Sequence, residues 1–299
     1  MIHFSVLAVI LVCALIWERP IRYHKLNSIY YGERYDYKSP LMPWLIVFGY
    51  IAYLAAMRSG MNDTSGYIQS FEHIPGTWDD VSRILDGDGK DKAFDITANI
   101  FKMYVSDDYH GWFGLFAAVE SCIFIHVLRR ESVSFLDSCF VLFATALYYN
   151  YFSMMRQWFA VVLLFGGAIF IKEGKTIPYI LSLIHISEPT RPRLIAYIHR
   201  DRIDAGNKMI HICINMSLIN FLLNLLATFT CGLYVIRLAT YTAGYSLILY
   251  PYLLNVTVSS RNRSALKVGF YILYFIFYCY QMSHQGSWGY NSDILGVFS

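Results

Sequence analysis

The stretch Tyr151-Phe-Ser-Met-Met-Arg156-Gln157-Trp-Phe-Ala-Val-Val-Leu-Leu-Phe-Gly-Gly-Ala-Ile-Phe170 decides the fold class. An arginine and a glutamine stand directly before a run of apolar residues that could enter a lipid bilayer. A guanidinium group is costly to remove from water, so at the mouth of a membrane helix it should face water, an anion or a protein cavity. The stretch therefore predicts a membrane helix with a functional arginine at one end.

The composition of the whole chain indicates the same class. Of the 299 residues, 56% are hydrophobic and only 15% are charged, whereas a soluble domain usually carries about 25% charged residues. We expect an all-α, polytopic integral membrane bundle that forms a single membrane domain over residues 1–299. The formal net charge of +3 is too small to suggest nucleic-acid binding.

Apolar runs predict about eight full transmembrane helices and one truncated helix. The full helices are expected at about 2–17, 41–57, 111–128, 133–149, 157–171, 209–235, 240–257 and 268–283. The first of them could pass for a signal sequence, but no basic residue precedes it and no small-residue cleavage site follows, which favours a membrane helix. The truncated helix begins at Ile177 and breaks within 187–192.

Charges between the helices predict the orientation. Basic residues gather in the loop 18–39, at Arg129-Arg130 and in the segment 191–208, and such clusters mark the cytoplasmic side. Segment 58–110 holds ten acidic and five basic residues, which suits the extracytoplasmic side. Both the N-terminus and the C-terminus are then predicted to be extracytoplasmic.

The truncated helix contains a foreign-looking stretch. The stretch resembles a translated sequencing adapter: Leu181-Ser-Leu-Ile-His-Ile-Ser-Glu-Pro-Thr-Arg-Pro192. We favour this interpretation over an ordinary loop bounded by prolines. The chain would then be an assembly chimera that has lost part of one helix and a second helix. His185 and Glu188 should carry no function, and the interruption counts against activity of this exact polypeptide.

Three arginines fall at predicted extracytoplasmic helix ends, namely Arg58, Arg156 and Arg237. The positive-inside rule disfavours arginine on the extracytoplasmic side, so the presence of three arginines there requires an explanation. One alternative is that each side chain lies along lipid and reaches the interface with its charged head. A cluster of guanidinium groups would instead bind an anionic diphosphate bidentately and favour the charge that develops on it.

Polar neighbours accompany these arginines. Asp63 follows Arg58 after a glycine-containing stretch, and it could serve as a catalytic base or simply as the N-cap of a short helix. Tyr241 lies one helical turn after Arg237, on the same face. The six cysteines all lie in apolar stretches without a Cys-x-x-Cys pair, so we interpret them as buried hydrophobic residues and not as a disulfide framework or zinc site.

These motifs together resemble the EpsG-type branch of the bacterial Wzy-like polysaccharide polymerases (O-antigen and exopolysaccharide polymerases). The resemblance rests on Arg58…Asn62-Asp63-Thr64…Tyr67, on Met155-Arg156-Gln157-Trp158-Phe159-Ala160, and on Arg237…Tyr241 followed by Tyr250-Pro251. It covers nearly the whole chain apart from the adapter-like stretch. Each motif is short, and their order and spacing carry more weight than any one of them.

The resemblance implies an enzyme of the bacterial cytoplasmic membrane. Such an enzyme joins undecaprenyl-diphosphate-linked oligosaccharide repeats at the outer membrane face, among membrane lipids and other polysaccharide-assembly proteins, without a metal or other cofactor. Arg156 and Arg237 would hold the diphosphate and Arg58 could share that role. Asp63 would be the base, while Gln157, Tyr67 and Tyr241 would bind substrate.

Two other functions would also use cationic residues. A transporter or flippase of lipid-linked oligosaccharide should carry charge through both leaflets and often shows internal repeats, and we find no repeat here. A polysaccharide ligase differs from a polymerase only in its acceptor, which the sequence does not reveal.

Overall fold

The structure is a computed structural model that describes residues 2–18, 23–24, 34–35, 40–87, 92–174, 208–229, 232–257, 260–284 and 289–297. The adapter-like stretch 181–192, with His185 and Glu188, lies outside the described residues. So does the truncated helix predicted from Ile177.

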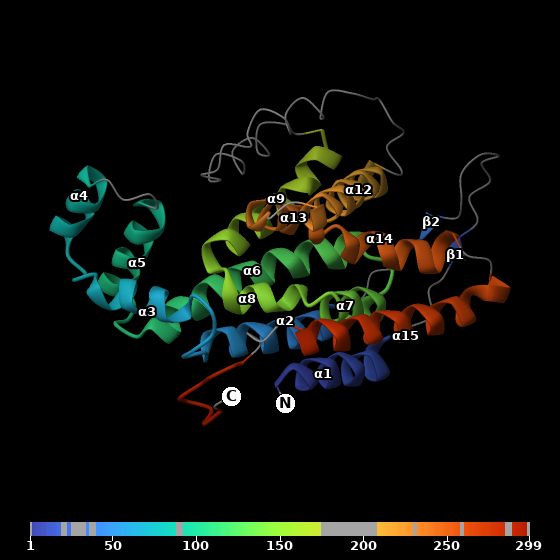
Figure 1. Cartoon of the computed structure of the whole chain (residues 1–299), viewed down its shortest axis with the longest axis horizontal. Coiled ribbons are helices and arrows are strands. Elements are labelled where there is room, and N and C mark those ends of the chain that lie inside the picture. Colours follow the sequence, from blue (N-terminus) through green and yellow to red (C-terminus); the bar gives the residue numbers. More distant parts are fainter. Residues whose placement is uncertain are drawn as a thin grey trace.

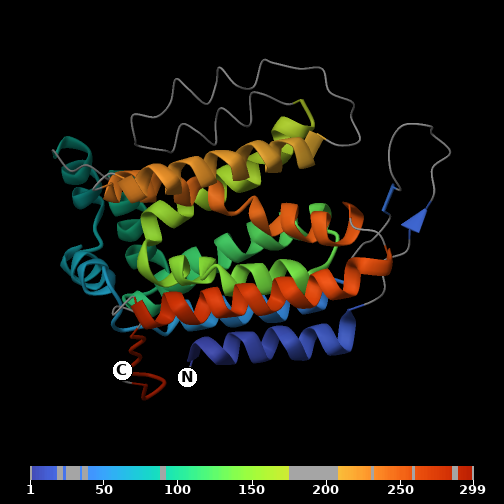
Figure 2. The same cartoon turned by 45° about the vertical axis from the view of Figure 1, so that its right-hand side comes forward.

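The described part of the chain is an all-α bundle, which confirms the predicted fold class. The long helices run along one common direction in Figures 1 and 2. They are α1 (Ile2–Trp17), α2 (Leu41–Ala56), α6 (Tyr109–Glu131), α7 (Phe135–Ala144), α9 (Met155–Lys172), α12 (Lys208–Phe229) and α15 (Ser260–His284). The loop after α1 contains a two-residue ribbon of β1 (Tyr23–His24) and β2 (Arg34–Tyr35).

Four of the described helices are long and apolar enough to cross a membrane. They span Tyr109–Glu131, Met155–Lys172, Lys208–Phe229 and Asn262–Ser283, whereas α1, α2 and α7 are apolar but shorter. The predicted number of about eight full-length spans is therefore not reproduced in the described residues.

An aromatic core holds α2, α6 and α9 together. Phe124 of α6 packs between Phe48 of α2, at 5.7 Å between ring centroids, and Trp158 of α9, also at 5.7 Å. These rings are buried, and aromatic pairs of this kind add about 0.5–1.5 kcal/mol each beyond the area they bury. The core thus fixes the first turn of α9, which carries Arg156.

Two of the predicted helices are broken, and the expectation of single spans at 133–149 and 240–257 is wrong. Helix α7 ends at Ala144, Ala146 adopts a left-handed backbone with φ 55°, and the chain continues as η1 (Leu147–Tyr149) and α8 (Asn150–Ser153). The second region divides at Gly244 into α13 (Leu233–Ala243) and α14 (Ser246–Tyr252). A π-helical turn, η2 (Leu253–Thr257), follows.

Proline explains part of the second break. Pro251 inside α14 has no N–H to offer the carbonyl of Leu247, four residues earlier. The hydroxyl of Ser138 on α7 donates to that carbonyl instead, at 2.7 Å. A carbonyl that would otherwise be unpaired in an apolar bundle is thereby satisfied by a neighbouring helix.

The position of Arg237 also differs from the prediction. Helix α12 ends at Phe229, so Arg237 does not close a long helix at 209–235 but lies on α13. Helix α13 returns along α12, and the amide of Asn220 on α12 donates to the Ala239 carbonyl at 2.7 Å and to the Thr242 hydroxyl at 3.1 Å.

Segment 58–110 forms three short helices at one end of the bundle (Figures 1 and 2). They are α3 (Thr64–His73), α4 (Trp78–Asp86) and α5 (Lys92–Tyr104). Both ends of the described chain lie at the same end, because His3 contacts Tyr148 and the tail residue Asn291 pairs with Gly60. The termini thus share a side with 58–110, as expected, and which side of a membrane this is stays a prediction.

Candidate functional site

The first turn of α9 presents its side chains in two directions. Trp158 is fully buried in the aromatic core, and its backbone N–H bonds to the Met154 carbonyl at 2.7 Å. Arg156, two residues earlier and on the other side of the helix, is exposed. Burial of the tryptophan therefore orients the arginine outward.

Two aromatic rings from segment 58–110 flank Arg156. Its guanidinium carbon lies 5.4 Å from the ring centroid of Tyr67 on α3 and 5.6 Å from that of Phe94 on α5. The two rings are themselves 6.0 Å apart. A cation over aromatic faces gains about 0.5–1 kcal/mol at an exposed site, so the rings position Arg156 while it stays charged and accessible.

Gln157 connects this turn to the segment that carries Arg237. The Gln157 side-chain amide donates to the Arg237 carbonyl at 2.9 Å. The Arg237 side chain is exposed on α13. The structure therefore brings Arg156, Gln157, Tyr67 and Arg237 to one end of the bundle.

Arg58 lies at the same end but is only 1% exposed. Its guanidinium donates to Thr64 Oγ1 (3.3 Å), to the carbonyls of Ala55 (2.7 Å) and Tyr151 (3.1 Å) and to Met155 Sδ (3.6 Å), and it covers the Phe113 ring at 4.2 Å. Burial lowers the pKa of Arg58 to about 10, an effect opposed by Glu120 and, more weakly, Tyr67 and Tyr290, so the group stays cationic at neutral pH. These internal partners favour a bracing role over direct contact with a ligand.

The remaining sequence-predicted residues occupy different environments. Asp63 stands at the N-cap position of α3, but its exposed side chain makes no capping hydrogen bond, so the carboxylate stays accessible. Tyr241 is half-buried against the bundle core, although it shares α13 with Arg237.

The tail and α6 contribute neighbours of Arg58 that the sequence did not indicate. Tyr290 donates to the Leu54 carbonyl at 2.8 Å, and Ser59 N–H donates to the Asn291 carbonyl at 2.9 Å, so the tail closes over the turn that holds Arg58. Glu120 of α6, which is 2% exposed, supplies a carboxyl group that favours the charged form of Arg58. A carboxyl group inside an apolar helix is the one sequence signal that could have identified this partner.

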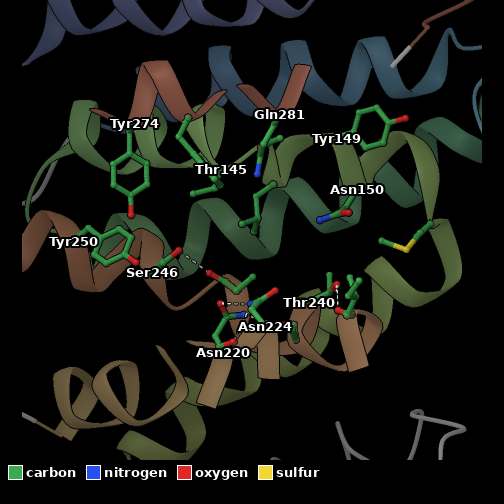
Figure 3. Close-up of a pocket in the computed structure, with 17 residues that line it drawn as sticks. Thr145, Tyr149, Asn150, Asn220, Asn224, Thr240, Ser246, Tyr250, Tyr274 and Gln281 are labelled. Atoms are coloured by element: carbon green, nitrogen blue, oxygen red, sulfur yellow. Dashed lines mark hydrogen bonds between the residues drawn. The ribbon is translucent and has the colours of Figure 1, made fainter. Parts of the chain in front are cut away.

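A cavity of about 470 Å³ opens beside Arg237 where the two broken helices face each other. Figure 3 shows its lining: Asn150 and Gln281 lie across the cavity from Asn220, Asn224 and Thr240. Amide side chains within apolar helices were a usable sequence signal, because burying an amide in a membrane requires a partner.

Within the described ranges, no group of three or more His, Cys, Asp or Glu side chains lies together in a way that could hold a metal ion. The candidate site consists of arginine, amide, hydroxyl and aromatic groups together with the Asp63 carboxylate.

Comparisons with known proteins identify the family. No curated protein and no solved structure matches the chain. The model of the EpsG family matches residues 41–187, a range that includes α2, α6, α7 and α9 with Arg58, Asp63, Tyr67, Arg156 and Gln157. The match supports a membrane protein of the polysaccharide-polymerase type. It confirms the resemblance found in the sequence over residues 41–187, and the Arg237…Tyr241 motif lies outside that range.

Proposed function

We propose that the protein is a membrane polymerase that joins undecaprenyl-diphosphate-linked oligosaccharide repeats into polysaccharide at the outer face of a bacterial cytoplasmic membrane. The observation that carries the proposal is the Gln157–Arg237 hydrogen bond, which holds the Arg237 segment against the turn that presents the exposed Arg156. Two guanidinium groups at one end of an apolar bundle suit a lipid-borne diphosphate, because each can make bidentate hydrogen bonds to phosphate oxygens.

The chemistry follows from these placements. A hydroxyl oxygen of one repeat forms a bond to the anomeric carbon of the other, and the bond from that carbon to the diphosphate oxygen breaks. Arg156 and Arg237 stabilise the negative charge that the diphosphate gains, which is the largest electrostatic demand of the step. Asp63 accepts the proton of the attacking hydroxyl. Arg58 acts indirectly by bracing the start of α9.

The test uses a bacterial strain that lacks the gene. The strain is complemented either with a gene that encodes this chain or with the gene obtained by resequencing across residues 177–195. Arg156→Lys keeps the charge but loses the planar fork. We expect it to reduce polymer strongly, with single lipid-linked repeats accumulating on the outer face. Arg129→Lys, an exposed site in the last turn of α6, is the matched control and should leave polymer unchanged.

Other outcomes count against the proposal. Undiminished polymer in the Arg156→Lys strain removes Arg156 from the diphosphate site. Repeats that accumulate on the cytoplasmic face indicate a flippase, and finished polymer that stays on its lipid indicates a ligase.

A further inference from the structure

The cavity beside Arg237 is lined by hydrogen-bonding groups without charge. It is open on one side and is bordered by η1 and α8, by α12, by α13 and α14, and by α15. The polar described residues that line it are Thr145, Tyr149, Asn150, Asn220, Asn224, Thr240, Ser246, Tyr250, Tyr274 and Gln281, and none of the described lining residues is acidic or basic. Its volume of about 470 Å³ falls within the range of roughly 300–1,000 Å³ usual for small-ligand sites.

Several of these groups have hydrogen-bonding capacity left for a ligand. The Gln281 Oε1 atom is buried and has no hydrogen-bond partner in the described part of the chain. The hydroxyls of Thr240 and Ser246 donate to the carbonyls of Ile236 and Ala243, which leaves their oxygen lone pairs as acceptors. A buried amide oxygen without a partner is costly, so a ligand that donates hydrogen bonds would stabilise this arrangement.

Aromatic rings cover one end of the cavity. Tyr250 and Tyr274 meet edge to face, with 5.8 Å between their centroids and an angle of 62°. Figure 3 shows both rings at the end away from Asn150. Tyrosine offers an apolar face together with a hydroxyl group, which suits a molecule that has both C–H surfaces and hydroxyls.

The cavity and the exposed arginine on α13 are neighbours. Ile236 and Thr240 line the cavity, and Arg237 lies between them in sequence, with Thr240 three residues further along the same helix. Residues three apart lie on the same side of a helix, so Arg237 is close to the cavity wall although it does not line the cavity.

We propose that this cavity binds a saccharide unit of the lipid-linked substrate, next to the position where the arginines hold its diphosphate. This inference rests on the proposed function. Neutral amides, hydroxyls and tyrosine rings complement a hydroxyl-rich, uncharged sugar. An anionic group would find no cation among the described lining residues, and a hydrocarbon tail would leave the Gln281 side-chain oxygen without a partner.

The test measures two ligands on the full-length chain purified in detergent. Binding of methyl glycosides of glucose, galactose, rhamnose and N-acetylglucosamine is followed by saturation-transfer NMR, and binding of inorganic pyrophosphate by calorimetry. The cavity variants are Gln281→Leu and the isosteric Thr240→Val. The controls are Gln69→Leu, which changes an exposed amide on α3, and Arg156→Lys. Melting temperatures identify any variant that fails to fold. If Gln281→Leu fails to fold, Thr240→Val still tests the cavity.

We expect at least one glycoside to show saturation transfer that falls several-fold in both cavity variants and is unchanged in Gln69→Leu and Arg156→Lys. Pyrophosphate binding should show the reverse pattern, with a loss only in Arg156→Lys. Full glycoside signal in folded cavity variants, or no glycoside signal in a preparation that binds pyrophosphate, overturns the saccharide site alone. Glycoside binding that depends on the cavity, without pyrophosphate binding that depends on Arg156, counts against the proposed function and leaves the saccharide site standing.

Discussion

The side-chain amide of Gln157 donates to the carbonyl oxygen of Arg237 at 2.9 Å, across 80 residues of sequence. This bond joins the first turn of α9 to α13. Helix α13 runs back along α12. Together with the contact between the Phe165 and Tyr245 rings, this neutral side chain sets the relative position of the two exposed arginines.

Gln157→Met removes the donor and keeps the length of the side chain. The loss of one hydrogen bond of this kind should lower the free energy of unfolding by only about 0.5–1.5 kcal/mol. Polymer formation should fall further than stability does, because the two guanidinium groups lose their fixed spacing. Thermal unfolding in detergent and polymer yield in cells measure the two effects. Equal polymer in the variant and the parent would show that this bond does not set the spacing.

Arg58 and Arg156 should respond oppositely to alanine. Arg58→Ala leaves the buried carbonyls of Ala55 and Tyr151 without their donor, and we expect a cost of about 3 kcal/mol or more. Arg156→Ala removes an exposed cation from two rings, and it should cost less than about 1 kcal/mol. Chemical unfolding of both variants in micelles compares them directly.

The activity of the same two variants separates bracing from binding. Arg156→Ala should be folded yet produce no polymer, whereas Arg58→Ala should lose polymer in proportion to the protein that remains folded. A stable Arg58→Ala protein without polymer would instead place Arg58 in contact with substrate.

A buried ion pair fastens α15 to α7 at the far end of the bundle. Asp137 is fully buried, and its carboxylate accepts from Lys267 Nζ at 2.9 Å, from Asn255 Nδ2 at 2.6 Å and from the Tyr271 hydroxyl. Lys267→Met should destabilise the protein by about 3–5 kcal/mol, because it leaves a buried carboxylate without its cation.

The control for this pair is the double variant Asp137→Leu with Lys267→Met. Replacing both charges with apolar groups should recover much of the lost stability, and a double-mutant cycle measures the coupling. A double variant that is as unstable as the sum of the single variants would show that the two groups are not coupled.

Close helix contact at Gly166 holds α9 against α6. A Cβ atom built at Gly166 would lie 2.7 Å from Cγ2 of Ile123, a β-branched side chain with little freedom to move. Gly166→Val should therefore cost about 1–3 kcal/mol through overpacking. Gly49→Ala on α2, where nothing lies within 4 Å of the added Cβ, is the matched control. It should be neutral or stabilise the helix by up to about 1 kcal/mol, since alanine has the higher helix propensity.

Apolar length and charge placement predicted much of this bundle. The helices expected at 157–171, 111–128 and 268–283 lie within or close to α9, α6 and α15, because long apolar runs between charged residues have few other stable conformations in a membrane. The same reasoning merged α7 with η1, and α13 with α14. Hydrophobicity carries no information about the left-handed backbone at Ala146 or the division at Gly244.

The sequence predicted which residues belong to the site better than it predicted the role of each residue. Arg156 was identified because a charge before an apolar run is conspicuous, and the structure leaves it exposed. Arg58 looked equivalent in sequence, yet its burial depends on Tyr151 and on Phe113, which are distant along the chain. The cavity depends on six helical elements, from η1 to α15, that meet only in three dimensions.

The interruptions in α7 and α13–α14 have a consequence for the solvent. Where a helix stops inside an apolar bundle, its last carbonyl groups need donors that hydrocarbon cannot provide, and a cavity lined by amides and hydroxyls admits water to supply them. A hydrated recess of this kind would place a competing nucleophile beside any activated sugar. Chain growth without wasteful hydrolysis then requires the incoming acceptor to displace that water before the leaving group is released.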